Sequence, residues 1–286
     1  MTPPDRSPLT HHTRIAFIGG GNMARSLIGG LIRAGTFRTA LTVGEPGAEL
    51  ASALAHDFGV AAGPDNAVAV DGAAAWVLAV KPQVMKAVCE PLRGLAQVNK
   101  PLVISIAAGI RAEQIERWLG GDVAVVRCMP NTPALIGAGA IGLYSNARVG
   151  AEQHLLAERI LSSAGVTAWI DDEALMDTVT ALSGSGPAYF FLLVEALENA
   201  AVAQGLPRET ARALAVQTCL GAGRMMIEDG ATPAELRQRV TSAGGTTQAA
   251  LESFAASGFS AIVARAVAAA TARGREMSEH FGDDEK

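Results

Sequence analysis

Three glycines near the start of the chain interrupt an apolar run and precede a small residue at a fixed distance. Gly19, Gly21 and Ala24 form the pattern G-x-G-x-x-A. Apolar residues 15–18 come before it and predict a buried strand, while helical apolar spacing follows over residues 27–32. A strand, a glycine turn and a helix in this order are typical of the phosphate-binding loop of a dinucleotide fold. An ordinary glycine-rich turn between a core strand and a core helix is the alternative.

Each small residue of the pattern has a physical task in such a loop. Gly19 permits the tight turn, Gly21 lets a pyrophosphate approach the backbone, and Ala24 keeps the helix close to the strand. The N–H groups of the first helical turn then face the anion, and the helix dipole favours its negative charge. The sequence therefore predicts that a dinucleotide binds here.

An acidic residue follows the second predicted strand, residues 41–43. Glu45 lies 24 positions after Gly21. In a dinucleotide fold, a carboxylate at this point accepts hydrogen bonds from the adenosine ribose, and it would repel a 2′-phosphate. Glu45 therefore favours NADH over NADPH. A solvated glutamate in a turn is the alternative.

Predicted strands and helices alternate as far as residue 171, which indicates right-handed βαβ units and a parallel sheet. Residues 74–80 are continuously apolar, as a strand buried on both faces requires. Because ligands bind at the carboxyl ends of such strands, Lys81 and Gln83 are candidates to contact cofactor or substrate. A solvated lysine at a strand end is the alternative. Further strands are expected at 102–107, 123–126, 140–144 and 166–170, and helices at 48–58, 84–95, 111–119 and 151–164.

The composition changes after Asp171. The stretch as far as residue 279 shows no β pattern and is rich in Ala, Leu, Met, Glu and Arg, which favour helices. Pro187, Pro207 and Pro233 fit the first position of new helices. We expect an α/β chain, with a Rossmann-like, doubly wound and mostly parallel sheet followed by an all-α C-terminal domain. The predicted divisions are a flexible tail at 1–13, a dinucleotide-binding domain at 14–171, a helical domain at 172–279 and an acidic tail at 280–286.

A glycine pair and two threonines open a predicted helix late in the chain. Ser242 and Ala243 precede Gly244 and Gly245, and the threonines follow, with the helix continuing to about residue 256. Free N–H groups and hydroxyls at the start of a helix suit a small carboxylate. An ordinary helix cap is the alternative.

The composition argues against several classes of protein. The net charge is −5 without a compensating basic block, which argues against nucleic acid as a partner. Cys89, Cys128 and Cys219 lie far apart and the histidines are scattered, so we expect neither a metal site nor a disulfide framework. Signal-peptide and membrane-helix patterns are not found. We therefore expect a soluble cytoplasmic protein that has no membrane partner.

Five segments together are similar to one known family. In chain order they read F-I-G-G-G-N-M-A, A-V-K-P-Q, R-C-M-P-N-T-P, S-G-S-G-P-A-Y-F and V-T-S-A-G-G-T-T. Over residues 14–277 the chain resembles pyrroline-5-carboxylate reductase, and the last segment is the most specific. The resemblance implies reduction of Δ1-pyrroline-5-carboxylate to L-proline by hydride transfer from NADPH or NADH, the last step of proline biosynthesis.

The resemblance also implies where the ligands bind and how the chain assembles. The helical domain is expected to form an interleaved homodimer, and larger rings of dimers occur in the family. Glu45 departs from the small polar or basic residues often found there in NADPH-preferring members. The implied substrate-binding residues are Ser242, Gly244, Gly245, Thr246 and Thr247. The implied cofactor-binding residues are Gly19, Gly21, Asn22, Met23, Ala24, Asn66, Ala79, Val80, Lys81, Pro82 and Gln83.

The chemistry of imine reduction suggests roles within residues 242–247. A hydride adds to the C=N carbon of a protonated cyclic imine, so the enzyme mainly has to align donor and acceptor. We predict that backbone N–H groups of residues 245–247 hold the substrate carboxylate. Thr247 is the predicted catalytic residue, its hydroxyl bonded to the ring nitrogen and helping to deliver a proton.

Two other functions fit parts of the pattern. An imine or β-hydroxyacid reductase shares the domain plan, but hydroxyacid enzymes need a catalytic lysine on the helix after the boundary. The only basic residue between Asp172 and Glu209 is Arg208, and no lysine follows until Lys286. A dinucleotide sensor without turnover is the second alternative, and the carboxylate-binding segment at 242–247 disfavours it.

Overall fold

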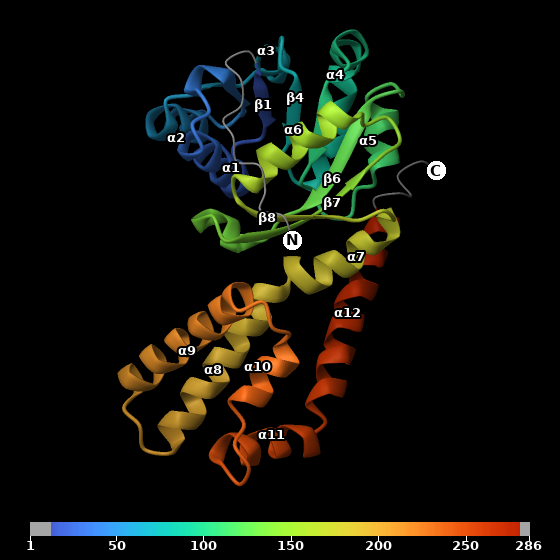
Figure 1. Cartoon of the computed structure of the whole chain (residues 1–286). Helices are drawn as coiled ribbons and strands as arrows, with labels where there is room; N and C mark the ends of the chain where they lie inside the picture. Colours follow the sequence, from blue (N-terminus) through green and yellow to red (C-terminus); the bar gives the residue numbers. More distant parts are fainter. Residues whose placement is uncertain (1–12, 281–286) are drawn as a thin grey trace. The chain divides into compact units, whose positions relative to one another are not determined.

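The computed structural model describes residues 13–280, and the chain divides into two compact units. The first unit consists of Met1–Gly184 and Ala270–Lys286, and the second consists of Ser185–Ala269. The chain thus leaves the first unit once and returns to it through its last helix (Figure 1). Apart from residues 13 and 280, the predicted tails lie outside the described residues.

Eight strands form a single sheet in the first unit. They are β1 (Ile15–Ile18), β2 (Leu41–Gly44), β3 (Ala61–Gly63), β4 (Ala75–Leu78), β5 (Leu102–Ser105), β6 (Ala124–Met129), β7 (Gly139–Ser145) and β8 (Gly165–Trp169). Their order in the sheet is β3-β2-β1-β4-β5-β6-β7-β8, and β6 and β7 are the only antiparallel neighbours in this sheet. The predicted Rossmann-like, mostly parallel sheet is therefore confirmed.

Six longer helices cover the two faces of this sheet (Figure 1). Helices α1, α2 and α6 pack on one face and α3, α4 and α5 on the other, as in a doubly wound fold. The helices are α1 (Asn22–Arg33), α2 (Ala48–Phe58), α3 (Asn66–Val70), α4 (Met85–Asn99), α5 (Ala112–Trp118) and α6 (Ala151–Ser162). The shorter turns are η1 (Arg38–Ala40), η2 (Pro82–Val84), η3 (Thr132–Ile136), η4 (Glu173–Leu175), α7 (Met176–Val179) and the π-helical η5 (Thr180–Gly184).

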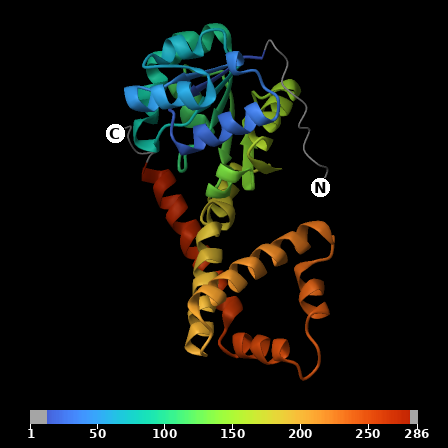
Figure 2. The same cartoon turned by 90° about the vertical axis from the view of Figure 1, so that its left-hand side faces the viewer.

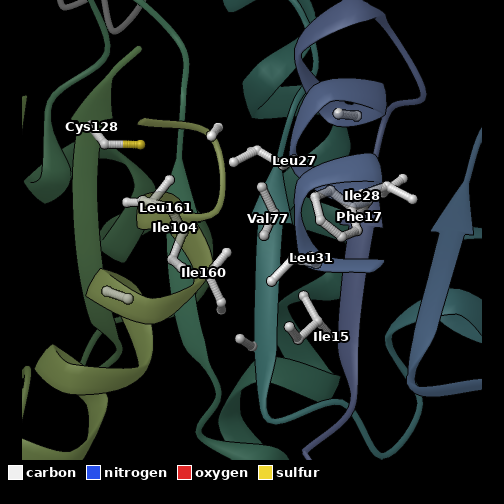
Figure 3. Packing of buried hydrophobic residues seen from close by; sticks show 14 of the residues in the cluster. Ile15, Phe17, Leu27, Ile28, Leu31, Val77, Ile104, Cys128, Ile160 and Leu161 are labelled. Atoms are coloured by element: carbon white, nitrogen blue, oxygen red, sulfur yellow. The ribbon is translucent and has the colours of Figure 1, made fainter. Parts of the chain in front are cut away.

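The core has two layers because successive strand residues point to opposite faces of the sheet. Phe17, Leu27 and Leu161 belong to the layer under α1 and α6 (Figure 3). The next residue, Ile18, belongs with Trp76 to the other layer. All five side chains are completely buried, and each such burial stabilises the fold by about 1.5–3 kcal/mol. The sheet is therefore rigid at the ends from which its loops emerge.

The boundary between the compact units lies later than the predicted division at residue 171. The first unit extends to Gly184 and also takes up the chain from Ala270 onwards. Residues 172–184 pack on the sheet, where a Cβ added to Gly142 of β7 would lie 2.4 Å from the Cγ1 atom of Val179. These contacts are tertiary, so a change in composition does not locate them.

A buried ionic cluster fastens this segment to the sheet. Arg127 of β6 is only 4% exposed, and its Nη1 atom lies 3.1 Å from the Glu173 carboxylate. The Arg127 Nη2 atom lies 3.9 Å from Asp177, which accepts a 3.3 Å hydrogen bond from the Ser278 hydroxyl. The same Glu173 oxygen also accepts from the Ala112 N–H. One arginine thus joins a central strand to the segments at both points where the chain enters or leaves the unit.

Helices are the only regular elements among the residues of the second unit, Ser185–Ala269. Its helices are α8 (Gly186–Ala203), α9 (Arg208–Glu228), α10 (Pro233–Arg239), α11 (Thr246–Ala256) and the first part of α12 (Phe259–His280). Pro233 is the first residue of α10, as predicted, whereas Pro187 is the second residue of α8. Pro207 instead caps α9, one position earlier than expected. The all-α prediction is confirmed.

The helices of the second unit bury little of their own apolar surface. Figure 2 shows them following one another along the chain without closing around a shared interior. Among its described residues, the buried hydrophobic side chains are those of Ala211 and Leu236. Helices α8 and α9 pack together, and Glu198 accepts hydrogen bonds from Arg208 and Arg212 across them. These bonds lower the pKa of Glu198, and the bond from Arg212 has the largest effect.

No single helix within residues 13–280 is long and apolar enough to cross a membrane. Helices α11 and α12 reach the required length and composition only as a pair, and they are bent by 54° relative to each other.

We predict that Arg127→Leu destabilises the protein strongly. Removal of the guanidinium leaves Glu173 and Asp177 partly buried without their counter-ion, which costs about 3–5 kcal/mol. Urea unfolding followed by circular dichroism measures the change. Arg273→Leu is the matched control, because it breaks an exposed pair with Glu276 and costs less than about 1 kcal/mol. Equal losses in both variants would contradict the role given to the cluster.

Candidate functional site

The glycine turn after β1 is held between the ends of two neighbouring strands. Gly19 has a φ of +94°, and its N–H donates to the Gly44 carbonyl at 2.8 Å. A Cβ added to Gly19 would lie 2.8 Å from the carbonyl oxygen of Ala79. Both the dihedral angle and the close approach exclude a side chain. The chain turns here because only glycine fits.

Helix α1 begins directly after this turn with an open N-terminus. Gly21 is its N-cap residue and supplies no side chain to bond the first N–H groups. A Cβ added to Gly21 would meet nothing within 4 Å, so the space in front of these N–H groups is open. Ala24 faces the other way and is completely buried. Unbonded N–H groups, a helix dipole and open space fit a pyrophosphate.

Glu45 lies against the same turn, where the sequence predicted the ribose-binding acid. Its Oε2 atom accepts a hydrogen bond from the Gly20 N–H at 2.8 Å. Its Oε1 atom accepts one from the Gly47 N–H, also at 2.8 Å. The carboxylate is therefore fixed beside the phosphate loop at the carboxyl end of β2.

Asn66 begins α3 and contacts the end of β2. A Cβ added to Gly44 would lie 2.3 Å from its Oδ1 atom. That oxygen is buried and has no hydrogen-bond partner among the described residues. A buried polar atom without a partner is unusual, and polar atoms of a dinucleotide would satisfy such a side chain. The Asp65 side chain caps α3 and fixes the position of Asn66.

The end of β4 supplies the other side of this region. Ala79 N–H donates to the Ile18 carbonyl at 2.7 Å, and a Cβ added to Gly19 would lie 3.0 Å from Val80. Lys81 and Gln83 lie beyond this contact and are exposed, at the start of η2. The structure thus brings together the predicted residues of β1, β2, α3 and β4. No contact of Lys81 or Gln83 with the glycine turn is found among the described residues.

The predicted substrate segment lies in the second unit, in the turn before α11. Gly244 has a φ of +71°, and the Gly245 N–H donates to the Ser242 carbonyl at 3.0 Å. Gly245 is the N-cap residue and gives the helix no side-chain cap, so the N–H groups that follow are open to an anion. Thr247 is half-buried in the first turn.

Gln248 belongs to this turn, although sequence reasoning did not count it as a site residue. Its Oε1 atom accepts a 2.7 Å hydrogen bond from the Gly244 N–H, and its Nε2 atom donates to Glu252 at 2.7 Å. The spacing of four between the three residues is a signal that helical periodicity offers. Gln248 holds the glycine turn in the shape that exposes the N–H groups of the helix.

The cysteines do not contribute a nucleophile to these sites. Burial raises the pKa of Cys89 to about 12 and raises that of Cys128 still further. Within residues 13–280, no group of three or more His, Cys, Asp and Glu side chains is placed to hold a metal ion. The chemistry that the sites offer is anion binding at two helix N-termini and a threonine hydroxyl.

A doubly wound sheet with a glycine turn at β1 and an acid after β2 defines a dinucleotide-dependent oxidoreductase. The comparisons agree. A family model described as NADP oxidoreductase, coenzyme F420-dependent, matches residues 14–109. A second, described as pyrroline-5-carboxylate reductase dimerisation, matches residues 173–277.

Relatives described as pyrroline-5-carboxylate reductases match nearly the whole chain. A pyrroline-5-carboxylate reductase of Pseudomonas aeruginosa is 52% identical over 271 residues, covering 94% of this chain and 98% of the relative. A solved pyrroline-5-carboxylate reductase from Coxiella burnetii has a TM-score of 0.91 and is 42% identical. The match covers 93% of this chain and 99% of that structure. A solved pyrroline carboxylate reductase from Plasmodium falciparum with NADP bound has a TM-score of 0.82 and is 29% identical. The match covers 94% of this chain and 100% of that structure.

The chain belongs to the pyrroline-5-carboxylate reductase family. It reduces Δ1-pyrroline-5-carboxylate to L-proline with NADPH or NADH, the last step of proline biosynthesis.

The two loop glycines should respond differently to alanine. We predict that Gly19→Ala lowers the free energy of unfolding by about 2–5 kcal/mol, because it adds a strained dihedral angle and a contact with the Ala79 carbonyl. Gly21→Ala should melt like the wild type, because its methyl group meets open space, but bind NADH at least about tenfold more weakly. Thermal unfolding measures the stability of each variant, and NADH fluorescence titration measures its affinity for NADH. Wild-type NADH affinity in Gly21→Ala would exclude the loop as the pyrophosphate site.

Proposed function

We propose that the two predicted groups of residues perform the two halves of the reaction. The glycine turn, Glu45 and Asn66 of the first unit bind the dinucleotide with residues 79–83, and residues 242–247 of the second unit bind the substrate. The observation that carries the substrate assignment is the uncapped start of α11 at Gly245. A substrate carboxylate would accept hydrogen bonds from its N–H groups, with the helix dipole adding to the attraction.

The chain's own groups need to supply orientation and one proton. The bound nicotinamide supplies the hydride, which adds to the C=N carbon of the ring. Thr247 lies in the same helical turn as the proposed carboxylate site, so its hydroxyl can hydrogen-bond the ring nitrogen while the carboxylate is held. The ring nitrogen takes a proton from the Thr247 hydroxyl, which recovers one from solvent, and becomes the secondary amine of L-proline. Holding the carboxylate and the nitrogen together orients the imine carbon.

We also propose that the working protein is a homodimer or a larger ring of dimers. The second unit exposes a large apolar surface, whereas stable monomers rarely expose large contiguous apolar patches. Phe191 is 68% exposed and Ile227 is 83% exposed. A second copy of the same helices would cover these side chains and complete the core that the unit lacks. The large apolar side chains exposed on α8, α9, α11 and α12 are Phe190, Phe191, Leu192, Leu193, Leu197, Leu214, Val216, Leu220, Met225, Met226, Ile227, Phe254, Phe259, Ile262 and Val263.

We propose a cytoplasmic location for this enzyme. Cys89, Cys128 and Cys219 are free thiols, and unpaired cysteines are typical of a reducing compartment.

The Thr247 hydroxyl is tested by removing and restoring it. We predict that Thr247→Ala binds NADH as the wild type does but loses about a hundredfold in kcat with pyrroline-5-carboxylate, because the proton donor is absent. Thr247→Ser keeps the hydroxyl and should regain most of the activity. Nicotinamide absorbance follows turnover. Wild-type kcat in Thr247→Ala would remove the hydroxyl from the mechanism.

The assembly is tested on the exposed face of α8. We predict that Phe191→Arg shifts the protein towards a monomer, because a buried charge opposes association. Light scattering coupled to size-exclusion chromatography reports the mass. Val98→Arg changes a residue of the first unit that is 81% exposed, and it should leave the mass unchanged. A wild-type monomer, or an unaltered oligomer in Phe191→Arg, would contradict this proposal.

A further inference from the structure

Glu45 is held by three hydrogen bonds, two of them to its carboxylate. Both of its oxygen atoms accept 2.8 Å hydrogen bonds from backbone N–H groups, one from Gly20 and one from Gly47. The Glu45 N–H in turn donates to the Gly63 carbonyl at 2.8 Å. A carboxylate that accepts two backbone hydrogen bonds cannot turn away without losing both. Its negative charge is therefore a fixed part of the loop.

The stretch of chain that contains Glu45 is acidic and does not offset this charge. The sequence contains no lysine or arginine between Arg38 and Lys81, a stretch that forms β2, α2, β3, α3 and β4. The same stretch carries five carboxylates, on Glu45, Glu49, Asp57, Asp65 and Asp71. These are the elements that follow the glycine turn at the adenosine end of a dinucleotide fold.

Three basic groups in or beside this stretch contact the end of α2 that is remote from Glu45. Arg25 of α1 forms an ion pair with Asp57 and lies over the Phe58 ring. Arg38 donates to the Phe58 carbonyl at 2.9 Å, and the His56 ring lies 3.1 Å from Asp57. All of these contacts are at the C-terminal end of α2, whereas Glu45 precedes the N-terminal end of that helix.

A 2′-phosphate differs from a ribose hydroxyl mainly in charge. The hydroxyl donates a hydrogen bond to a carboxylate, whereas the phosphate adds about two negative charges and only acceptors. Folds that bind NADP supply an arginine for that phosphate, and folds that bind NAD supply an acid for the hydroxyls. In this chain, the position holds a tethered acid, and residues 39–80 include no arginine or lysine.

We propose that Glu45 makes this protein select NADH over NADPH. The inference rests on the proposed dinucleotide site and adds its specificity. The relative from Plasmodium falciparum has NADP bound, so membership of the family does not decide the coenzyme of this chain. The coenzyme preference of this chain depends on its own residues at the end of β2, above all Glu45.

Binding without the substrate gives the first test. The full-length protein is titrated with NADH and NADPH by nicotinamide fluorescence, and with ADP-ribose and its 2′-phosphate by calorimetry. The second pair isolates the adenosine end. We expect at least tenfold tighter binding of the form without the phosphate in both pairs. Equal or tighter binding of either phosphorylated form would overturn the proposal.

Three variants locate the cause. Glu45→Gln keeps the size of the side chain and one acceptor but removes the charge, and we expect about tenfold tighter binding of NADPH. Glu45→Ser removes the acid entirely and should shift the preference in the same direction, with weaker NADH binding. Glu49→Gln is the control, because it removes an exposed charge four residues away and should leave the ratio of the two dissociation constants unchanged. Melting temperatures verify that each variant is folded.

The outcomes separate this inference from the proposed function. An unchanged ratio in folded Glu45→Gln, or an equal shift in Glu49→Gln, would overturn the selectivity role even if the wild type turns over pyrroline-5-carboxylate. Loss of NADH binding in Gly21→Ala together with the expected ratio in Glu45→Gln would support both. Wild-type protein that binds neither coenzyme would refute the dinucleotide site itself.

Discussion

The contact between Gly19 and the Ala79 carbonyl determines the geometry of the first unit's nucleotide end. It joins the end of β1 to the end of β4, and the Gly19 N–H joins the same turn to Gly44 of β2. Three neighbouring strands therefore end at one point, which orients α1 so that its N-terminus opens outward. The buried layers on both faces of the sheet hold these strand ends in place. The glycine turn is held in place by its bonds and contacts with the strand ends.

Much of this arrangement could be predicted from the sequence, and the failures have physical reasons. The predicted bounds of α2 match the structure, because amphipathic periodicity and a closing glycine mark it. The short strand β3 and helix α3 were not predicted, since three residues of Ala and Gly and five of Asn, Ala and Val carry no periodic signal. The site could be assembled only in part for the same reason, because Asn66 was assigned by resemblance and not by an expected element.

The boundary of the units shows a second limit. Composition changes near residue 171, yet the first unit continues to Gly184, because Glu173 and Asp177 reach Arg127 in the sheet. Pairing between residues that far apart leaves no local pattern. The second unit shows the opposite case. Its helices were predictable from their residues, but their exposed apolar surface is explained only by contact with a partner. Local preference determined its helices, and association has to supply its core.

The position of Glu45 was predictable from local spacing, whereas its tertiary contacts were not. Its distance from the glycine pattern predicted an acid at the adenosine ribose, but spacing did not reveal that both oxygens are bonded to backbone N–H groups. Those bonds make the carboxylate part of the loop that carries the phosphate site. A change of coenzyme preference in this chain therefore has to preserve the Gly20 bond while removing the charge. An amide meets this requirement better than a small side chain, since it retains an acceptor for one N–H.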